Sequence, residues 1–362
     1  MKNRIVKLDI ARTFAILCVI LCHCSEMTYF NDTVVLKNLK ITSRIFMMGT
    51  FTIGRFGVSI FLYLSGVLLL RKVIENDEDI FKFYRNNLLP LIAVNEVWLV
   101  IYKIYEVFVL KQVFDFADFI KELLLFKNSS MTNMWYMPMI IGIYIGVPFL
   151  AKIVKTFSFK SILPIMTAIF IFYYIEPMLN VIARISNSGQ TFGSEMSIPY
   201  MGTIYGLYLL VGYYLYDNQA KLKKIRNWHL ILTAILSYGV ILCFEVYSLS
   251  DKSHYIYKVW YDFPFLLICT ACIFILFLRI DDAVINDKWR KIFTYMSRIS
   301  MGIYFVHVIV IMTKIKYMGQ IFASLSLETA FLTIITIVLS AVVVGLFGIN
   351  KYVARYIFLI KH

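Results

Sequence analysis

Charged residues are scarce in this sequence. Only 16% of its 362 residues are Asp, Glu, Lys or Arg, whereas about 25% is usual for a soluble chain. Hydrophobic residues make up 60%, and the mean hydropathy is +0.75. The composition excludes a soluble globule and predicts an all-α polytopic membrane helix bundle. Since no polar stretch is long enough for a separate soluble domain, we expect one integral-membrane domain over residues 1–362.

Cysteine and histidine are also rare, with six and five residues. Every cysteine lies in an apolar run, which is typical of packed thiols and not of a disulfide framework. The tripeptide Cys22-His23-Cys24 has metal-binding residue types, but neighbours on a helix point in different directions. The sequence therefore predicts no metal site and no tightly bound cofactor.

Acidic residues are fewer than basic ones, 22 against 36, which gives a formal net charge of +14. No basic run is interleaved with aromatic residues in a soluble segment, so the charge gives no reason to expect nucleic acid as a partner. Lys and Arg in loops at the membrane surface explain the charge better. Membrane lipids are therefore the first expected partner.

Apolar runs close to 20 residues long recur along the whole chain and predict about ten transmembrane helices. Nearly twice as many Lys and Arg residues fall in one alternating set of connecting segments as in the other. This bias predicts that both termini are cytoplasmic. The longest outer segment, 25–54, is expected to be a loop that folds over the outer mouth. The predicted spans are about 8–25, 55–71, 88–110, 134–151, 161–182, 198–216, 228–247, 259–278, 299–317 and 329–349.

The first apolar run, residues 8–24, carries Asp9, Arg12 and His23. Arg12 and His23 are eleven residues apart, which on a helix is about three turns plus 20°. Both side chains therefore project from one face, roughly 16 Å apart along the axis. An arginine inside a bilayer costs several kcal/mol unless it faces protein or water. This pattern favours a helix that lines a polar cavity; the alternative is that these residues lie at the two headgroup levels.

Three later stretches carry residues that fit packing as well as chemistry. Ser65-Gly66 allows either close helix packing or the approach of a ligand to bare backbone. Trp135, at the start of the fourth span, is typical of an interfacial aromatic belt. The ninth span places Tyr304 and His307 within the membrane.

Together these residues resemble the pattern of membrane acyltransferase family 3, whose members O-acylate bacterial surface glycans. The matches are loose singly, but they occur in the family's order from the first span to the ninth. Ile60 stands where the family has an aromatic residue. The matching residues are Leu8-Asp9, Arg12, Ala15 and His23; Gly57, Ile60-Phe61, Ser65-Gly66 and Arg71; Trp135 to Pro138; and Ser300, Ile303-Tyr304 and His307.

The resemblance implies transfer of an acyl group, acetyl first, from cytoplasmic acyl-coenzyme A to a hydroxyl of a cell-surface or lipid-linked glycan. It implies a multi-pass protein of the bacterial plasma membrane. His23 would be the general base, since histidine titrates near neutral pH, and Arg12 would hold the amides or the carbonyl of the donor's pantetheine arm. The basic residues would bind the donor phosphates. The residues expected to bind the donor are Arg71, Lys72, Arg85, Ser65 and Gly66, and the implied supporting residues are Trp135, Tyr304 and His307. Glu26, three residues after His23, is expected to orient the imidazole.

Several alternatives stay open at this stage. A transporter or flippase of lipid-linked glycan would also have many spans and buried charges, although no internal repeat supports one. Direct transfer and a covalent acyl-histidine intermediate fit the residues equally well. The acceptor glycan, the length of the acyl group and the oligomeric state, including a homodimer, are not set by the sequence.

Overall fold

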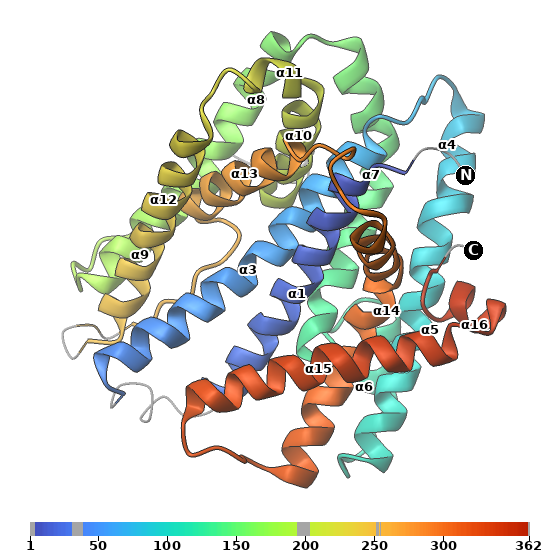
Figure 1. The fold of residues 1–362 in the computed structure, drawn as a ribbon, viewed down its shortest axis with the longest axis vertical. Helices are drawn as coiled ribbons and strands as arrows, with labels where there is room; N and C mark the ends of the chain where they lie inside the picture. Colours follow the sequence, from blue (N-terminus) through green and yellow to red (C-terminus); the bar gives the residue numbers. More distant parts are fainter. Residues whose placement is uncertain (1–3, 31–38, 194–202, 251–252, 254, 361–362) are drawn as a thin grey trace. The chain divides into compact units, whose positions relative to one another are not determined.

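The computed structural model describes the chain except residues 1–3, 31–38, 194–202, 251–252, 254 and 361–362. Every regular element of the described residues is helical, as predicted (Figure 1). The α-helices are α1 (Val6–Tyr29), α3 (Ile41–Leu69), α4 (Asp77–Phe83), α5 (Leu89–Phe108), α6 (Phe116–Leu123), α7 (Tyr136–Thr156), α8 (Phe159–Phe170), α9 (Glu176–Ile185), α10 (Thr203–Asp217), α11 (Gln219–Leu222), α12 (Asn227–Ser248), α13 (Pro264–Leu278), α14 (Asp287–Met318), α15 (Leu325–Phe347) and α16 (Lys351–Tyr356).

The helices form two compact units, each built from two separate stretches of chain. Unit 1 comprises Met1–Val73 and Phe149–Ser297, and unit 2 comprises Ile74–Pro148 and Arg298–His362. Short stretches of tighter or wider helix continue the α-helices. They are a π-helical turn at Tyr84–Leu88 before α5, another at Ile171–Ile175 between α8 and α9, and a 3₁₀ turn at Thr132–Trp135 before α7.

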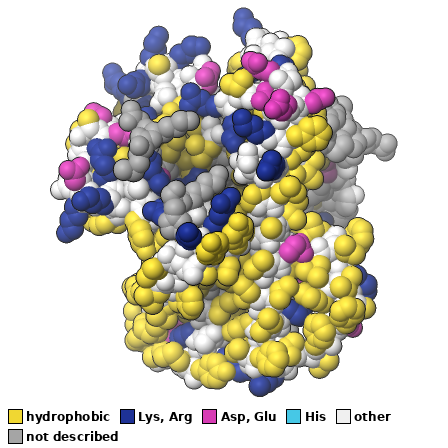
Figure 2. Space-filling view, turned by 90° about the vertical axis from the view of Figure 1, so that its right-hand side faces the viewer, with side chains coloured by type: hydrophobic (Ala, Val, Ile, Leu, Met, Phe, Trp, Pro, Cys, Tyr) yellow, Lys and Arg dark blue, Asp and Glu magenta, His cyan; other side chains and the backbone are white. Residues whose placement is uncertain are grey.

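Eight helical stretches of the described residues are long and apolar enough to cross a membrane. Hydrophobic side chains also cover much of the face drawn in Figure 2. Two of the ten predicted spans are represented by shorter helices, α10 and α13, of 15 residues each. A helix of that length is about 22 Å long, less than the roughly 30 Å of a hydrocarbon core. The chain is a polytopic helical membrane protein, as the composition predicts.

Contacts between connecting segments in unit 1 fit the predicted alternation of spans. Lys155 donates to the carbonyl of Lys72 at 2.7 Å, which puts the segments after the second and fourth spans at one level. Lys7 donates to Gln219 and to the carbonyl of Leu278, so three further segments share a level. The chain returns to the Lys7 level after α10 and again after α13, as it must if both short helices cross.

Residues 25–54 were predicted to form an outer loop. This prediction is wrong for most of the described residues in that stretch. Helix α1 continues to Tyr29, and α3 begins at Ile41. The reason is that residues 41–54 are largely apolar, and Met47, Met48 and Phe51 are fully buried on one side of the helix. Residues 31–38 of this stretch lie outside the described residues.

Glycines on α3 allow three helices of unit 1 to pack backbone against backbone. A Cβ atom on Gly57 would lie 2.5 Å from the carbonyl oxygen of Ala15 on α1. A Cβ on Gly66 would collide with the backbone of Leu209 on α10. Small residues at such positions are the usual means of close helix approach in membranes. The glycines thereby fix α3 against α1, which carries His23.

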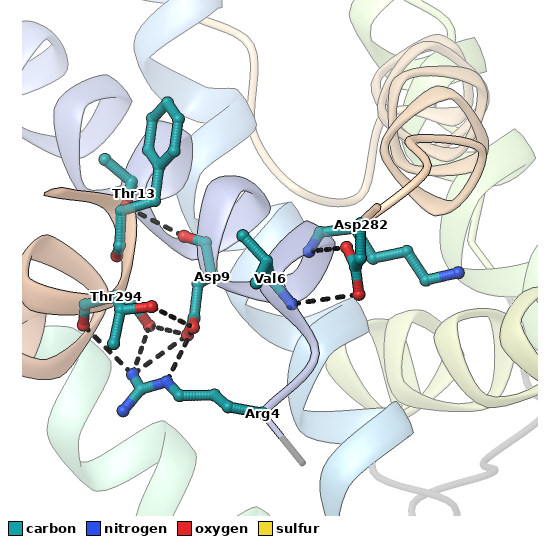
Figure 3. A network of polar contacts seen from close by, with 9 residues as sticks. Arg4, Val6, Asp9, Thr13, Asp282 and Thr294 are labelled. Atoms are coloured by element: carbon teal, nitrogen blue, oxygen red, sulfur yellow. Dashed lines mark hydrogen bonds and ion pairs between the residues drawn. The ribbon is translucent and has the colours of Figure 1, made fainter. Parts of the chain in front are cut away.

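Asp9 anchors the N-terminal end of α1 within unit 1 (Figure 3). Its carboxylate accepts two bonds from Arg4, at 2.7 and 3.0 Å, and one from Ser297 at 2.6 Å. The backbone N–H groups of Val6 and Lys7 donate to Asp282 at 3.2 and 2.8 Å. These bonds satisfy N-terminal donors of the helix. The network holds the start of α1 in a fixed position, so Asp9 has a structural explanation.

Candidate active site

The candidate site in unit 1 is built on His23, near the C-terminal end of α1. His23 is buried, and its Nδ1 atom lies 3.2 Å from Oε2 of Glu26, one turn further along the helix. Residues three apart on a helix are neighbours, so α1 itself sets this pairing. The Glu26 side chain is 25% exposed. The pair is therefore enclosed on the histidine side and open on the carboxylate side.

A buried arginine from α3 adds a third group to the pair. Nη2 of Arg55 lies 3.4 Å from Oε1 of Glu26, so each carboxylate oxygen of Glu26 has its own partner. Arg55 is only 5% exposed. A buried cation needs an anion or a polarisable surface around it, and Glu26 supplies the anion. The result is a chain of three groups, His23–Glu26–Arg55, which we call the triad.

Aromatic rings enclose the arginine of the triad. The guanidinium carbon lies 4.6 Å from the ring centre of Phe51, 4.5 Å from that of Trp260 and 5.7 Å from that of Tyr261. Such stacking attracts a cation to the ring face and leaves the edge of the guanidinium for hydrogen bonds. The rings keep Arg55 pointing toward Glu26.

A fully buried carboxylate, Glu245 on α12, holds the segment that carries Trp260. It accepts from the hydroxyl of Thr52 at 2.5 Å and from the backbone N–H of Val259 at 2.9 Å. Next to Val259, the ammonium of Lys258 lies 3.9 Å from the ring centre of Phe30. Burial lowers the pKa of Lys258, which lies in the segment between α12 and α13. These contacts close one side of the triad with residues distant in sequence.

The sequence analysis missed Arg55, Glu245 and Trp260. One signal was available: Arg55 stands four residues after Phe51 in an apolar run, the spacing at which two side chains share a helix face. The sequence contains no such signal for Glu245 and Trp260, because their place beside Arg55 depends on how α12 packs near α3.

The predicted residue of the first helix, Arg12, also lies in unit 1. So do four of the residues predicted to bind the donor, which are Ser65, Gly66, Arg71 and Lys72. Arg12 is half-buried on the same continuous helix as His23. Ser65 donates its hydroxyl to the carbonyl of Phe61 at 2.9 Å. Beside it, Gly66 faces α10, which supports the packing interpretation. Arg71 is exposed just after α3, with its guanidinium carbon 4.8 Å from the ring centre of Tyr216, and Lys72 follows it.

The remaining predicted residues lie in unit 2. Tyr304 on α14 donates to the carbonyl of Asn133 at 2.5 Å, and its ring packs 5.6 Å from that of Tyr136. Trp135 packs edge-on against Tyr136. His307 is fully buried, with Nδ1 3.2 Å from the carbonyl oxygen of Ile303. The structure thus brings the motif of the fourth span together with that of the ninth.

Arg85 belongs to unit 2, whereas Arg71 belongs to unit 1. It is exposed and lines a groove with two other basic residues, Lys351 and Arg355. Among the described residues, no group of three or more His, Cys, Asp or Glu side chains is placed to hold a metal ion.

Comparison with known proteins identifies the family. The model of acyltransferase family 3, described as an acyltransferase domain, matches residues 5–345. Neither curated proteins nor solved structures gave a match. The family match covers nearly the whole chain, including every element of the triad, and confirms the resemblance drawn from the motifs. The chain therefore belongs to acyltransferase family 3 and is a multi-pass membrane acyltransferase.

Proposed function

We propose that the protein transfers an acyl group, most simply acetyl, from acyl-coenzyme A to a hydroxyl of a cell-surface or lipid-linked glycan, with His23 as the general base. The observation that carries the proposal is the triad. A buried histidine paired with a carboxylate, which is itself paired with a cation, is a known way to orient an imidazole for proton transfer. The family match supplies the reaction class, and the triad supplies the base.

The geometry suggests how the proton moves. In the tautomer that carries its proton on Nδ1, 3.2 Å from Oε2 of Glu26, the basic nitrogen of His23 is Nε2. A sugar hydroxyl loses its proton to Nε2 as its oxygen bonds to the thioester carbonyl carbon. When the carbon–sulfur bond breaks, the imidazolium returns the proton to the departing coenzyme A sulfur. Glu26 stabilises the imidazolium while it exists, and Arg55 keeps Glu26 ionised and in place.

The function is tested by the release of the free thiol of coenzyme A. Membranes that contain the protein should release it from acetyl-coenzyme A when an acceptor glycan is present, and should transfer the labelled acetyl group to that glycan. Thiol release without ester formation on any glycan would overturn the glycan proposal. A transporter or flippase would produce neither signal.

The donor is expected to bind at the end of α3 through Arg71 and Lys72. Each charge-assisted hydrogen bond to a phosphate is worth about 1.5–3 kcal/mol. Arg71→Ala should therefore weaken acetyl-coenzyme A binding by roughly 10- to 100-fold, and Arg71→Lys should restore part of it. Calorimetry on the purified protein in detergent measures the affinity. Arg226→Ala, an exposed arginine elsewhere in unit 1, is the matched control; equal affinity in Arg71→Ala and wild type would contradict the assignment.

The protein is proposed to lie in the plasma membrane with both termini in the cytoplasm. In a background without native cysteines, Lys111→Cys should react with a membrane-impermeant thiol reagent in intact cells. Asp77→Cys should react only after permeabilisation. Both positions are exposed, so access to reagent depends on the side of the membrane alone. The reverse pattern would put His23 toward the cytoplasm and overturn the outward acceptor.

A further inference from the structure

A basic groove on unit 2 belongs neither to the triad nor to the end of α3. It has a volume of about 910 Å³ and lies between the start of α5 and helix α16. Three cations line it, Arg85, Lys351 and Arg355, and none of its lining residues is acidic. All three are exposed. Since like charges repel, three cations on one groove are stable only with an anion nearby, from solvent or from a ligand.

Apart from Asn86 and two tyrosines, the rest of the lining is apolar. Leu89, Pro90, Ala93 and Val94 supply one wall from the first turns of α5. A solvated phosphate alone would leave this wall in contact with water. The groove therefore fits an amphiphile that has an anionic head and an apolar arm.

The chain around the groove carries large apolar side chains that face outward. Leu89 is 56% exposed, and Leu346, Phe347 and Ile349, all within five residues of Lys351, are 62–78% exposed. Helix α15, a membrane-span candidate, ends at Phe347. Exposed apolar residues of this size are stable against hydrocarbon and unfavourable in water. Such residues next to the end of a candidate span fit a groove at the headgroup level.

Two tyrosines at the groove have neighbours that are typical of the lipid headgroup level. Tyr352 and Tyr356 are more than half exposed. Lys351 lies 5.4 Å from the ring centre of Tyr352, and Arg355 lies 5.5 Å from that of Tyr356. Tyrosine and long basic side chains together are typical of the membrane–water interface. Basic pockets at the ends of membrane helices commonly bind anionic headgroups.

We propose that this groove binds an anionic phospholipid. The phosphate lies among Arg85, Lys351 and Arg355, and one acyl chain runs along the apolar wall of α5. The lipid neutralises the three cations and joins α16 to α5. This role is independent of the acyl transfer proposed above.

The test uses the full-length protein purified in a mild detergent and a defined lipid. Dioleoyl-phosphatidylglycerol is added, and the bound lipid is counted by native mass spectrometry. Dioleoyl-phosphatidylcholine, with the same chains and no net charge, is the comparison lipid. Replacing Arg85, Lys351 and Arg355 together with Gln should weaken phosphatidylglycerol binding by roughly 100-fold, the effect expected from three interfacial cations.

Two further variants separate the groove from general charge and from misfolding. Replacing Lys152, Lys160 and Lys223, exposed cations of unit 1, with Gln removes the same charge and should leave lipid binding unchanged. Arg85→Lys with Arg355→Lys keeps the charge and should retain most of it. Equal binding of the two lipids, or an equal loss in both Gln variants, overturns the proposal. Competition between coenzyme A and phosphatidylglycerol also overturns it and makes the groove a donor site.

Discussion

Replacing His23 with alanine is expected to lower the rate of acyl transfer by about 10²–10⁴-fold, the usual contribution of a general base. The hydroxyl of a sugar has no other route for its proton in the triad, because Glu26 is paired with Arg55 and Arg55 is always charged. The measurement is the initial rate of acetyl transfer to the glycan, at equal amounts of inserted protein. The affinity for acetyl-coenzyme A should change little, since the proposed donor site is at Arg71 and Lys72, just after the C-terminal end of α3, and not at the triad.

The control for this variant is His307→Ala. His307 is as deeply buried as His23, but its Nδ1 atom lies 3.2 Å from the backbone carbonyl oxygen of Ile303 on its own helix. We therefore expect a smaller effect on rate from His307→Ala. If His23→Ala keeps near-full activity while His307→Ala loses it, the base lies in unit 2 and the role given to the triad is wrong.

The sequence predicted the parts of the fold that depend on local pattern. Apolar length predicts spans, and it does so well where a helix is long, as in α1 and α15. It failed at residues 41–54, where Thr, Ser and Arg interrupt a largely apolar stretch and the packing of α3 favours a helix over a loop. Apolar length also overestimated the length of α13, which was predicted from residue 259. The helix begins only at Pro264, because a proline is readily accepted in the first turn of a helix.

The candidate site shows the same limit. His23 was found because it shares a face of the first span with Arg12 and matches the family pattern, and Glu26 because it lies one turn from His23. Arg55 lies on the next helix, and its aromatic neighbours Trp260 and Tyr261 come from about 200 residues further along the chain. Nothing in a single sequence shows that these rings face that guanidinium. The family pattern marked Gly57 without giving its reason, which is the contact with Ala15 that brings α3 against α1.

Glu26 offers the sharper test of mechanism, because it is proposed to act only through His23. Glu26→Gln keeps the size of the side chain and removes its charge. Without the negative charge, the imidazolium is no longer stabilised and Arg55 loses its anion. We expect the rate of acyl transfer to fall substantially, but by no more than the 10²–10⁴-fold that the base itself contributes. Glu96→Gln, a partly buried glutamate on α5, is the matched control and should leave the rate unchanged.

The decisive measurement is the double variant. If Glu26 works by orienting His23, adding Glu26→Gln to His23→Ala should change the remaining rate by less than about 3-fold, because groups that act as a unit are strongly non-additive. Independent action would instead multiply the two losses. A multiplied loss, with normal insertion and normal donor affinity, would mean that Glu26 acts on the acceptor or the donor directly. The pairing with Arg55 would then serve to hold a carboxylate at the substrate, and the proton would have to leave by another group.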